Sequence, residues 1–205
     1  MLTDGLGETY RLVDPGFDIK RFPAQITMQR PIEAVLNLRQ RYGLRGEMVE
    51  TMTLEMRSRG HSAAIPNSGL DGKFSVEYCA AAALLDGWVG IETFTDARRF
   101  SPDMEETLPK VKVIPAGSGF ESNLIKVTAL LKDGRTVDEE CRSFRGSAAD
   151  PMSEEERLAK FRECARRVLN VGDLERLIET LQGLESLANV SVLMSLLSQK
   201  PAAQV

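Results

Sequence analysis

The segment from Lys73 to Gly87 constrains the fold most, because a run of small residues follows a polar entrance there. Four consecutive alanines at 80–83 stand between apolar neighbours at helical spacing, and Gly87 is placed to end a helix. A helix of small side chains can pack flat against another element, and its first turn offers N–H groups that attract anions. Carboxylates are therefore the first substrate class to consider. The plainer interpretation is a buried alanine-rich helix behind a solvated Lys73.

The composition is that of a globular protein with a substantial core, since 42% of the 205 residues are apolar. Lys and Arg number 26 against 30 Asp and Glu, and neither sign gathers into a long run, so we expect no nucleic-acid partner and no membrane partner. No segment has the length of apolar sequence that crosses a bilayer, and the N-terminus lacks a signal-peptide pattern. These features predict a cytoplasmic protein.

Cysteine and histidine usage argues against a metal site. Cys79, Cys141 and Cys164 are odd in number and far apart, which favours reduced thiols. His61 is the only histidine, so a zinc site of the usual kind has too few ligands. The sequence contains no Gly-x-Gly-x-x-Gly after a strand, no P-loop and no Gly-x-Ser-x-Gly elbow, which argues against dinucleotide, nucleotide and hydrolase functions. We expect no metal and no cofactor.

Periodicity predicts an α+β fold after an extended arm over residues 1–30. Strands are indicated over 48–56, 110–114, 125–131 and 136–141, the last two joined by the turn Asp133-Gly134. Helices are indicated from Pro31 to Gly43 and from Ser75 to Gly87, with short helical regions near 91–94 and after Pro102. We expect an antiparallel or mixed sheet of about four strands, with helices packed on one side and C-terminal helices following.

The character of the chain changes at Pro151. Ser153 and Glu156 form a capping box, and further helices are predicted to begin at Asp173 and near Val190. We expect an α+β domain over 1–150, a helical segment over 151–199 and a loose tail over 200–205. The apolar stripes of the last helices could bury one another, cover the sheet or pack against a partner domain that this chain lacks.

Cationic and phenolic side chains remain as candidates for chemistry: Lys20 and Arg21 in the arm, His61 in the loop 57–72, and Lys73, Ser75 and Tyr78 at the alanine-rich helix. A Lys or Arg can hold a carboxylate, and a neutral Lys or a Tyr can move a proton at the adjacent carbon. Each candidate has a simpler interpretation. Ser75 is a good helix N-cap, Tyr78 can be a core aromatic, and the others are common solvated residues.

The stretch from Lys73 to Gly87 resembles the Lys/Arg-Phe-Ser-x-x-Tyr segment, followed by small residues and Leu-x-Asp-Gly, of the MmgE/PrpD family. Three further segments agree with that family in the same order: Asp18–Ala24, Leu131–Arg135, and Arg145–Ser153 ahead of Lys160-Phe161. With these four segments in the same order, the resemblance extends over nearly the whole chain, from about Gly5 to Leu197. They are similar to the smaller α+β lid of these enzymes, which follows a large helical domain.

The resemblance implies the C-terminal domain of a cofactor-independent lyase or isomerase, similar to 2-methylcitrate dehydratase, that acts on small di- or tricarboxylates. The implied mechanism removes the proton α to a carboxylate and stabilises the resulting enolate-like charge. By position, Lys20, Lys73 and Tyr78 are implied as catalytic residues, and Arg21, Ser75 and His61 are substrate-binding candidates. A helical N-terminal domain or chain is implied as the partner that completes the site, and a homodimer is expected.

One departure from the family bears on the reaction. Decarboxylase-like members show His after the Phe-Pro segment, where this chain has Gln25 and Gln29. An amide side chain transfers no proton, which argues against decarboxylation. The alternative function is a non-catalytic remnant or subunit that keeps the lid fold and binds a partner chain.

Overall fold

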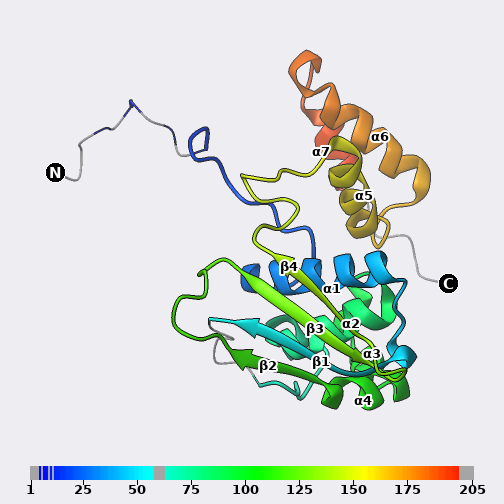
Figure 1. Cartoon of the computed structure of the whole chain (residues 1–205). Helices are drawn as coiled ribbons and strands as arrows, with labels where there is room; N and C mark the ends of the chain where they lie inside the picture. Colours follow the sequence, from blue (N-terminus) through cyan, green and yellow to red (C-terminus); the bar gives the residue numbers. More distant parts are fainter. Residues whose placement is uncertain (1–4, 6, 9, 11, 58–62, 199–205) are drawn as a thin grey trace. The chain divides into compact units, whose positions relative to one another are not determined.

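A computed structural model describes residues 5, 7, 8, 10, 12–57 and 63–198 (Figure 1). The chain forms two units, Met1–Pro151 (unit 1) and Met152–Val205 (unit 2), and each is described by itself. Unit 1 combines a four-stranded mixed sheet with helices, which confirms the predicted α+β class. In the described part of the chain, no helix has the length and apolar character needed to cross a bilayer.

The sheet consists of β1 (Val49–Met56), β2 (Val111–Pro115), β3 (Ile125–Leu131) and β4 (Thr136–Cys141), in the order β2-β1-β3-β4. The β1–β2 pair is parallel, and the other two pairs are antiparallel. The predicted hairpin between β3 and β4 is confirmed. Gly134 has φ of +86° in its turn, and its N–H donates to the carbonyl of Leu131 at 2.9 Å.

The start of β1 differs in detail from the simple alternation in the sequence. Val49 pairs with Leu131 while Thr51 pairs with Leu130, so one extra residue stands in β1. Such a bulge lets Val49 and Met52 both point into the core, although they are three residues apart. The predicted first inward residue, Met48, instead ends the 3-10 turn η2 (Gly46–Met48) and is only half-buried.

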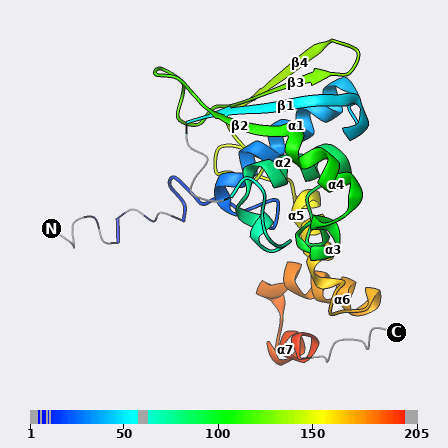
Figure 2. The ribbon, with the colours of Figure 1, turned by 90° about the horizontal axis from the view of Figure 1, so that it is seen from below.

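Helices α1 (Gln29–Tyr42) and α2 (Val76–Asp86) pack against one face of the sheet (Figure 2). The predicted end of α1 is confirmed, because Gly43 has φ of +63° and donates its N–H to Arg39. Its predicted start at Pro31 is wrong by two residues. The 3-10 turn η1 (Ile26–Met28) runs straight into the helix, and Pro31 lies within the first turn, where a missing N–H costs no helical hydrogen bond.

The helix α2 forms the centre of unit 1. Every residue from Val76 to Leu84 is buried, and Gly87 ends the helix with φ of +69°. A helix that is apolar on all sides needs neighbours on all sides. They are supplied by α1, β2, η2, and the connection to β2, which contains η4 (Glu92–Phe94), α3 (Asp96–Arg99), α4 (Pro102–Thr107) and η5 (Leu108–Lys110).

Unit 2 contains α5 (Glu154–Ala165), α6 (Val171–Gln182), the 3-10 turn η6 (Leu184–Ser186) and α7 (Ser191–Leu197). The predicted capping box of Ser153 and Glu156 is confirmed by both of its hydrogen bonds. The second helix begins at Val171 rather than at Asp173, because the Asn170 side chain caps it by accepting the Asp173 N–H at 3.0 Å. The hydrophobic core of this unit is small: Leu177, Leu193 and Leu196 are buried together, and Phe161, Leu169 and Leu187 pack against them.

Candidate functional site

Two segments of the predicted site meet at one backbone hydrogen bond in unit 1. The N–H of Gln25 donates to the carbonyl of Lys73 at 3.1 Å. Lys73 belongs to the 3-10 turn η3 (Asp71–Phe74), which leads into α2. The structure thus brings the Phe-Pro segment of the arm beside the entrance of α2, although about fifty residues separate them along the chain. Lys20 is exposed and lies five residues before this junction.

Gln29 fixes the same arm segment to the first turn of α1. Its side chain is fully buried, and the amide oxygen accepts the Phe22 N–H at 3.0 Å. The amide nitrogen donates to the Phe22 carbonyl at 3.1 Å. One amide therefore satisfies both backbone groups of Phe22, as a neighbouring strand would. This use of Gln29 is structural and needs both a donor and an acceptor.

Arg21 already has a carboxylate partner in the structure. Its Nη1 lies 3.0 Å from Oε1 of Glu33, and its guanidinium carbon lies 5.3 Å from the ring centroids of both Phe22 and Trp88. The two rings meet edge to face at 5.2 Å. The guanidinium is held by an ion pair and two cation–π contacts, and its carboxylate partner is Glu33 of this chain.

Lys73 carries its charge above an aromatic ring. The residue is half-buried, and its Nζ lies 5.7 Å from the centroid of Phe94. Such a contact stabilises an ammonium by roughly 0.5–1 kcal/mol at a partly exposed site. Phe94 was not singled out by the sequence, where the only signal is an aromatic residue in a short helical region. The ring gives Lys73 a defined position at the entrance of α2.

Ser75 caps α2, which confirms the structural role that the sequence offered for it. Its Oγ accepts the N–H of Tyr78 at 3.1 Å and donates to the carbonyl of Ala64 at 2.8 Å. The residue is buried. The cap satisfies one of the first-turn N–H groups that would otherwise attract an anion, and it ties the loop before η3 to the helix.

Tyr78 lies in the core. It has no exposed surface, its ring stands 6.3 Å from that of Phe94, and its hydroxyl donates to the carbonyl of Thr93. A Cβ on Gly72 would overlap the ring, so this glycine is needed for the close approach. Burial raises the pKa of Tyr78 to about 12. In this structure the hydroxyl has no surface from which to reach a substrate.

A small cavity of about 330 Å³ lies beside the entrance of α2. It is lined by Ala63, Pro66, Asn67, Asp71 and Phe74. The side chain of the buried Arg99 donates to the carbonyl of Pro66 at 2.8 Å and so holds this loop to α3. The sequence marked the loop by its many breakers, Pro66 and Asn67 among them, but none of these lining residues was predicted to bind a ligand. His61 lies outside the described residues.

The cysteines of unit 1 are structural thiols. Cys79 is fully buried and donates to the carbonyl of Gly72 at 3.3 Å, and burial raises its pKa. Burial also raises the pKa of Cys141 to about 12. Thiols of this kind are poor nucleophiles and poor metal ligands. Over residues 12–57 and 63–198 and the few described before them, no three His, Cys, Asp or Glu side chains gather as a metal site would require.

Comparison with known proteins agrees with the motifs that meet at this site. The sequence profile of the MmgE/PrpD C-terminal domain matches residues 22–186. Human cis-aconitate decarboxylase is 29% identical over 187 residues, which are 87% of this chain and 39% of that protein. The mouse cis-aconitate decarboxylase is 33% identical over 135 residues, which are 64% of this chain and 28% of that protein. The chain therefore spans well under half the length of these relatives, and it belongs to the MmgE/PrpD family through its C-terminal domain.

Proposed function

We propose that unit 1 supplies the cationic wall of a carboxylate-binding cleft in a lyase or isomerase of small di- or tricarboxylates. The observation that carries this proposal is the hydrogen bond between Gln25 and Lys73, which joins the two cation-bearing segments of the family motif. Lys73, placed over Phe94, and Lys20, on the exposed arm, are the residues proposed to hold carboxylate groups. Ammonium groups stabilise the charge that develops when a proton leaves the carbon α to a carboxylate.

Tyr78 enters the proposal as a positioning residue. Its hydroxyl is bonded to the Thr93 carbonyl, and its ring packs on Gly72 and near Phe94. These contacts hold η3 and η4 together, and so they hold the Lys73 ammonium where it lies over the ring. Arg21 and Ser75 support the same surface from either side through Glu33 and the cap of α2. His61 remains a substrate-binding prediction.

The acid and base for the reaction are proposed to come from a helical partner domain or chain. This chain spans 39% and 28% of the length of the two relatives described above, which supports a site completed by residues outside it. Unit 2 offers apolar side chains for such a partner, including the exposed Val171, Val190 and Leu197. An apolar cavity of about 260 Å³ lies between α5 and α6 and is lined partly by Phe161 and Ile178.

We propose that the chain serves only some of the reactions found in the family. The two curated relatives are named for the decarboxylation of cis-aconitate, a tricarboxylate. Gln25 is exposed and uses its backbone N–H, while the Gln29 amide is consumed by Phe22, so neither donates or accepts a proton in catalysis. We therefore favour a dehydratase or epimerase of the 2-methylcitrate dehydratase kind over a decarboxylase.

A second candidate function is a non-catalytic subunit that keeps the lid fold and binds a partner chain. The observation that favours it is the commitment of polar side chains to the fold. The Tyr78 hydroxyl, the Gln29 amide and the Ser75 hydroxyl are all used by backbone groups. In this case Lys73, at the entrance of α2, would contribute to the stability of the fold and would take no part in catalysis.

Amide chemical shifts of the full chain, titrated with cis-aconitate and 2-methylcitrate, test the carboxylate wall. We expect shifts at residues 72–76 and around Gln25, and an affinity about tenfold lower in Lys73→Ala, because a charge-assisted hydrogen bond is lost. Lys112→Ala is the matched control, since Lys112 is exposed on β2. Equal affinities for the two variants would contradict the assignment of Lys73.

Turnover separates the two candidate functions. The chain is co-expressed with the helical N-terminal domain of a family member, and loss of 2-methylcitrate, decarboxylation of cis-aconitate and epimerisation of iminodisuccinate are followed. Dehydration or epimerisation that falls in Lys73→Ala supports the enzyme. A stable complex that leaves all three compounds unchanged supports the non-catalytic subunit.

A further inference from the structure

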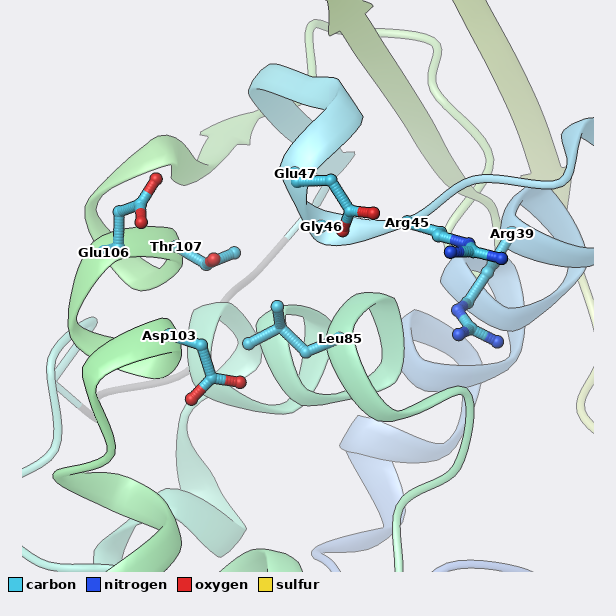
Figure 3. Close-up of a pocket in the computed structure, with 8 residues that line it drawn as sticks. All are labelled: Arg39, Arg45, Gly46, Glu47, Leu85, Asp103, Glu106 and Thr107. Atoms are coloured by element: carbon cyan, nitrogen blue, oxygen red, sulfur yellow. The ribbon is translucent and has the colours of Figure 1, made fainter.

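A second and larger cavity of unit 1 lies at the opposite end of α2 from Lys73 (Figure 3). Its volume is about 520 Å³, within the range of small-molecule sites. The last turns of α1 and α2, the turn η2 and the helix α4 enclose it. The lining residues are Arg39, Arg45, Gly46, Glu47, Leu85, Asp103, Glu106 and Thr107. Because α2 has 11 residues, its two ends are separated by about 15 Å.

One end of this cavity is cationic. Figure 3 shows the side chains of Arg39 and Arg45 together there. Arg39 is fixed, because its Nε donates to the carbonyl of Leu84 at 3.0 Å and its guanidinium packs where a Cβ on Gly87 would stand. The Arg45 side chain makes no hydrogen bond or ion pair with any other described residue. Neither guanidinium pairs with a carboxylate of the described residues, and two such groups at one end of a cavity favour an anion.

The other end carries oxygen atoms that accept hydrogen bonds. Asp103 and Glu106 lie there with Thr107 (Figure 3). Glu106 lies 2.8 Å from Lys110, and Asp103 lies 2.9 Å from Arg98, a guanidinium that also pairs with Asp86. Each carboxylate thus has a cation beside it, fully for Glu106 and shared for Asp103, while lone pairs of both stay available.

Glu47 lies between the two ends. Like Arg45, it forms no ion pair or side-chain hydrogen bond within the described part of the chain. At the cationic end and the middle of the cavity, two guanidinium groups therefore stand against one carboxylate, while Asp103 and Glu106 lie at the other end. Leu85 forms an apolar floor, and Gly46 packs so closely on it that a Cβ would overlap the leucine. This pattern suits a ligand with two carboxylates, one hydrogen-bond donor and a short carbon chain.

We propose that this cavity binds a small dicarboxylate that carries an amino or hydroxyl group. Its carboxylates lie against Arg39 and Arg45, and its amino or hydroxyl group donates to Glu47. The site is independent of the proposed function, because none of its residues takes part in the surface around Lys73. It gives the chain a second ligand site that needs no partner domain.

Amide chemical shifts of the full chain, measured at low ionic strength, locate the binding. The probes are L-aspartate, L-malate and succinate, which share two carboxylates and differ in the donor group. We expect shifts at residues 45–47, 85 and 103–107, with succinate bound at least severalfold more weakly than the other two. L-aspartate and L-malate separate an amino from a hydroxyl preference. Shifts confined to residues 72–76 would place binding at the Lys73 surface and overturn this proposal while leaving the proposed function standing.

Substitutions then test the cationic end and Glu47. Arg45→Ala should lower the affinity for L-aspartate about tenfold, since one charge-assisted contact is lost. Arg57→Ala is the matched control, because Arg57 is also exposed and lies beyond the far end of β1, about 25 Å away along the strand. Glu47→Gln should reduce the difference in affinity between L-aspartate and succinate, because the carboxylate that accepts from the amino group is lost. Equal affinities of the two arginine variants, or no shift with any probe at millimolar concentration, would overturn the proposal.

Discussion

The phenol of Tyr78 is a buried group with a single polar contact, to the carbonyl of Thr93. Tyr78→Phe should lower the free energy of unfolding at pH 7 by about 1–3 kcal/mol, because that carbonyl loses its donor while it stays buried. Denaturant unfolding measures the change. Tyr42→Phe is the control, since Tyr42 is 40% exposed and its ring contact with Arg41 survives the substitution.

The same phenol predicts a pH dependence. Its pKa is about 12 in the folded chain and near 10 when unfolded, so the unfolded chain binds fewer protons between these values. The free energy of unfolding should therefore fall as pH rises from about 10 to 12. Buried Cys79 and Cys141 add to this fall in both proteins, and so the difference between wild type and Tyr78→Phe isolates the phenol. Parallel curves over this range would contradict the prediction.

We predict that glutamate at position 29 cannot replace the stabilising role of the Gln29 amide. Gln29→Glu loses the donor to the Phe22 carbonyl and buries a carboxylate, so we expect a loss of about 2–4 kcal/mol at pH 7. Burial would raise the pKa of that carboxyl in the folded state. The deficit should shrink as pH falls, because the protonated acid can donate again.

Gln25→Glu provides the comparison for Gln29. Gln25 is exposed, and its backbone N–H, not its side chain, bonds to Lys73. The substitution should change stability by less than about 0.5 kcal/mol. A Gln29→Glu variant as stable as Gln25→Glu would show that the amide does not hold the arm.

At the scale of elements, alanine substitutions of the two glycines that end α1 and α2 distinguish the cost of backbone strain from the cost of lost packing. Gly43 and Gly87 have φ of +63° and +69°, but a Cβ at Gly43 meets nothing within 4 Å, whereas one at Gly87 overlaps the Arg39 guanidinium. Gly43→Ala should cost about 1 kcal/mol for strain. Gly87→Ala should cost more, since Arg39 must also give up the Leu84 carbonyl. Equal thermal shifts of the two variants would contradict this account.

Elements with strong local signals were predictable from the sequence. The Asp133-Gly134 hairpin, the Gly43 and Gly87 helix ends and the Ser153 capping box were all specified by adjacent residues. The errors arose where a tertiary feature changed the register. In β1, the pairing with β3 leaves Glu50 as the extra residue of a bulge. At α1, the turn η1 leads into the helix, which therefore begins before Pro31.

The candidate site was only partly predictable for the same reason. The sequence marked Lys73 and Arg21, but the rings beneath their charges, Phe94 and Trp88, come from segments that meet only in the fold. Arg39 and Arg45 were missed because they reach one cavity from different elements, α1 and the segment before β1. The spacing of residues within a motif gives no information on contacts between elements that are distant in the sequence.

At the scale of the whole molecule, the two units differ in how well they bury their own apolar residues. Unit 1 buries α2 from Val76 to Leu84, whereas α5 has no buried residue and α7 buries only Leu193 and Leu196. The exposed side chains of α7 include Met194 and Leu197 at 53% and 56%. Apolar surface of this kind favours association with a second copy when no other partner is present.

Sedimentation velocity over a concentration series tests this self-association. The wild-type chain should gain apparent mass as concentration rises, while Met194→Lys combined with Leu197→Lys should stay monomeric, because a charge on an exposed helix face opposes its burial without disturbing the core. Val13→Lys is the control, since Val13 is 83% exposed in unit 1 and should leave the association unchanged. A wild-type chain that stays monomeric throughout contradicts the prediction. An equal loss of association in the Val13→Lys control would indicate that the contact between copies involves unit 1 and not α7 alone.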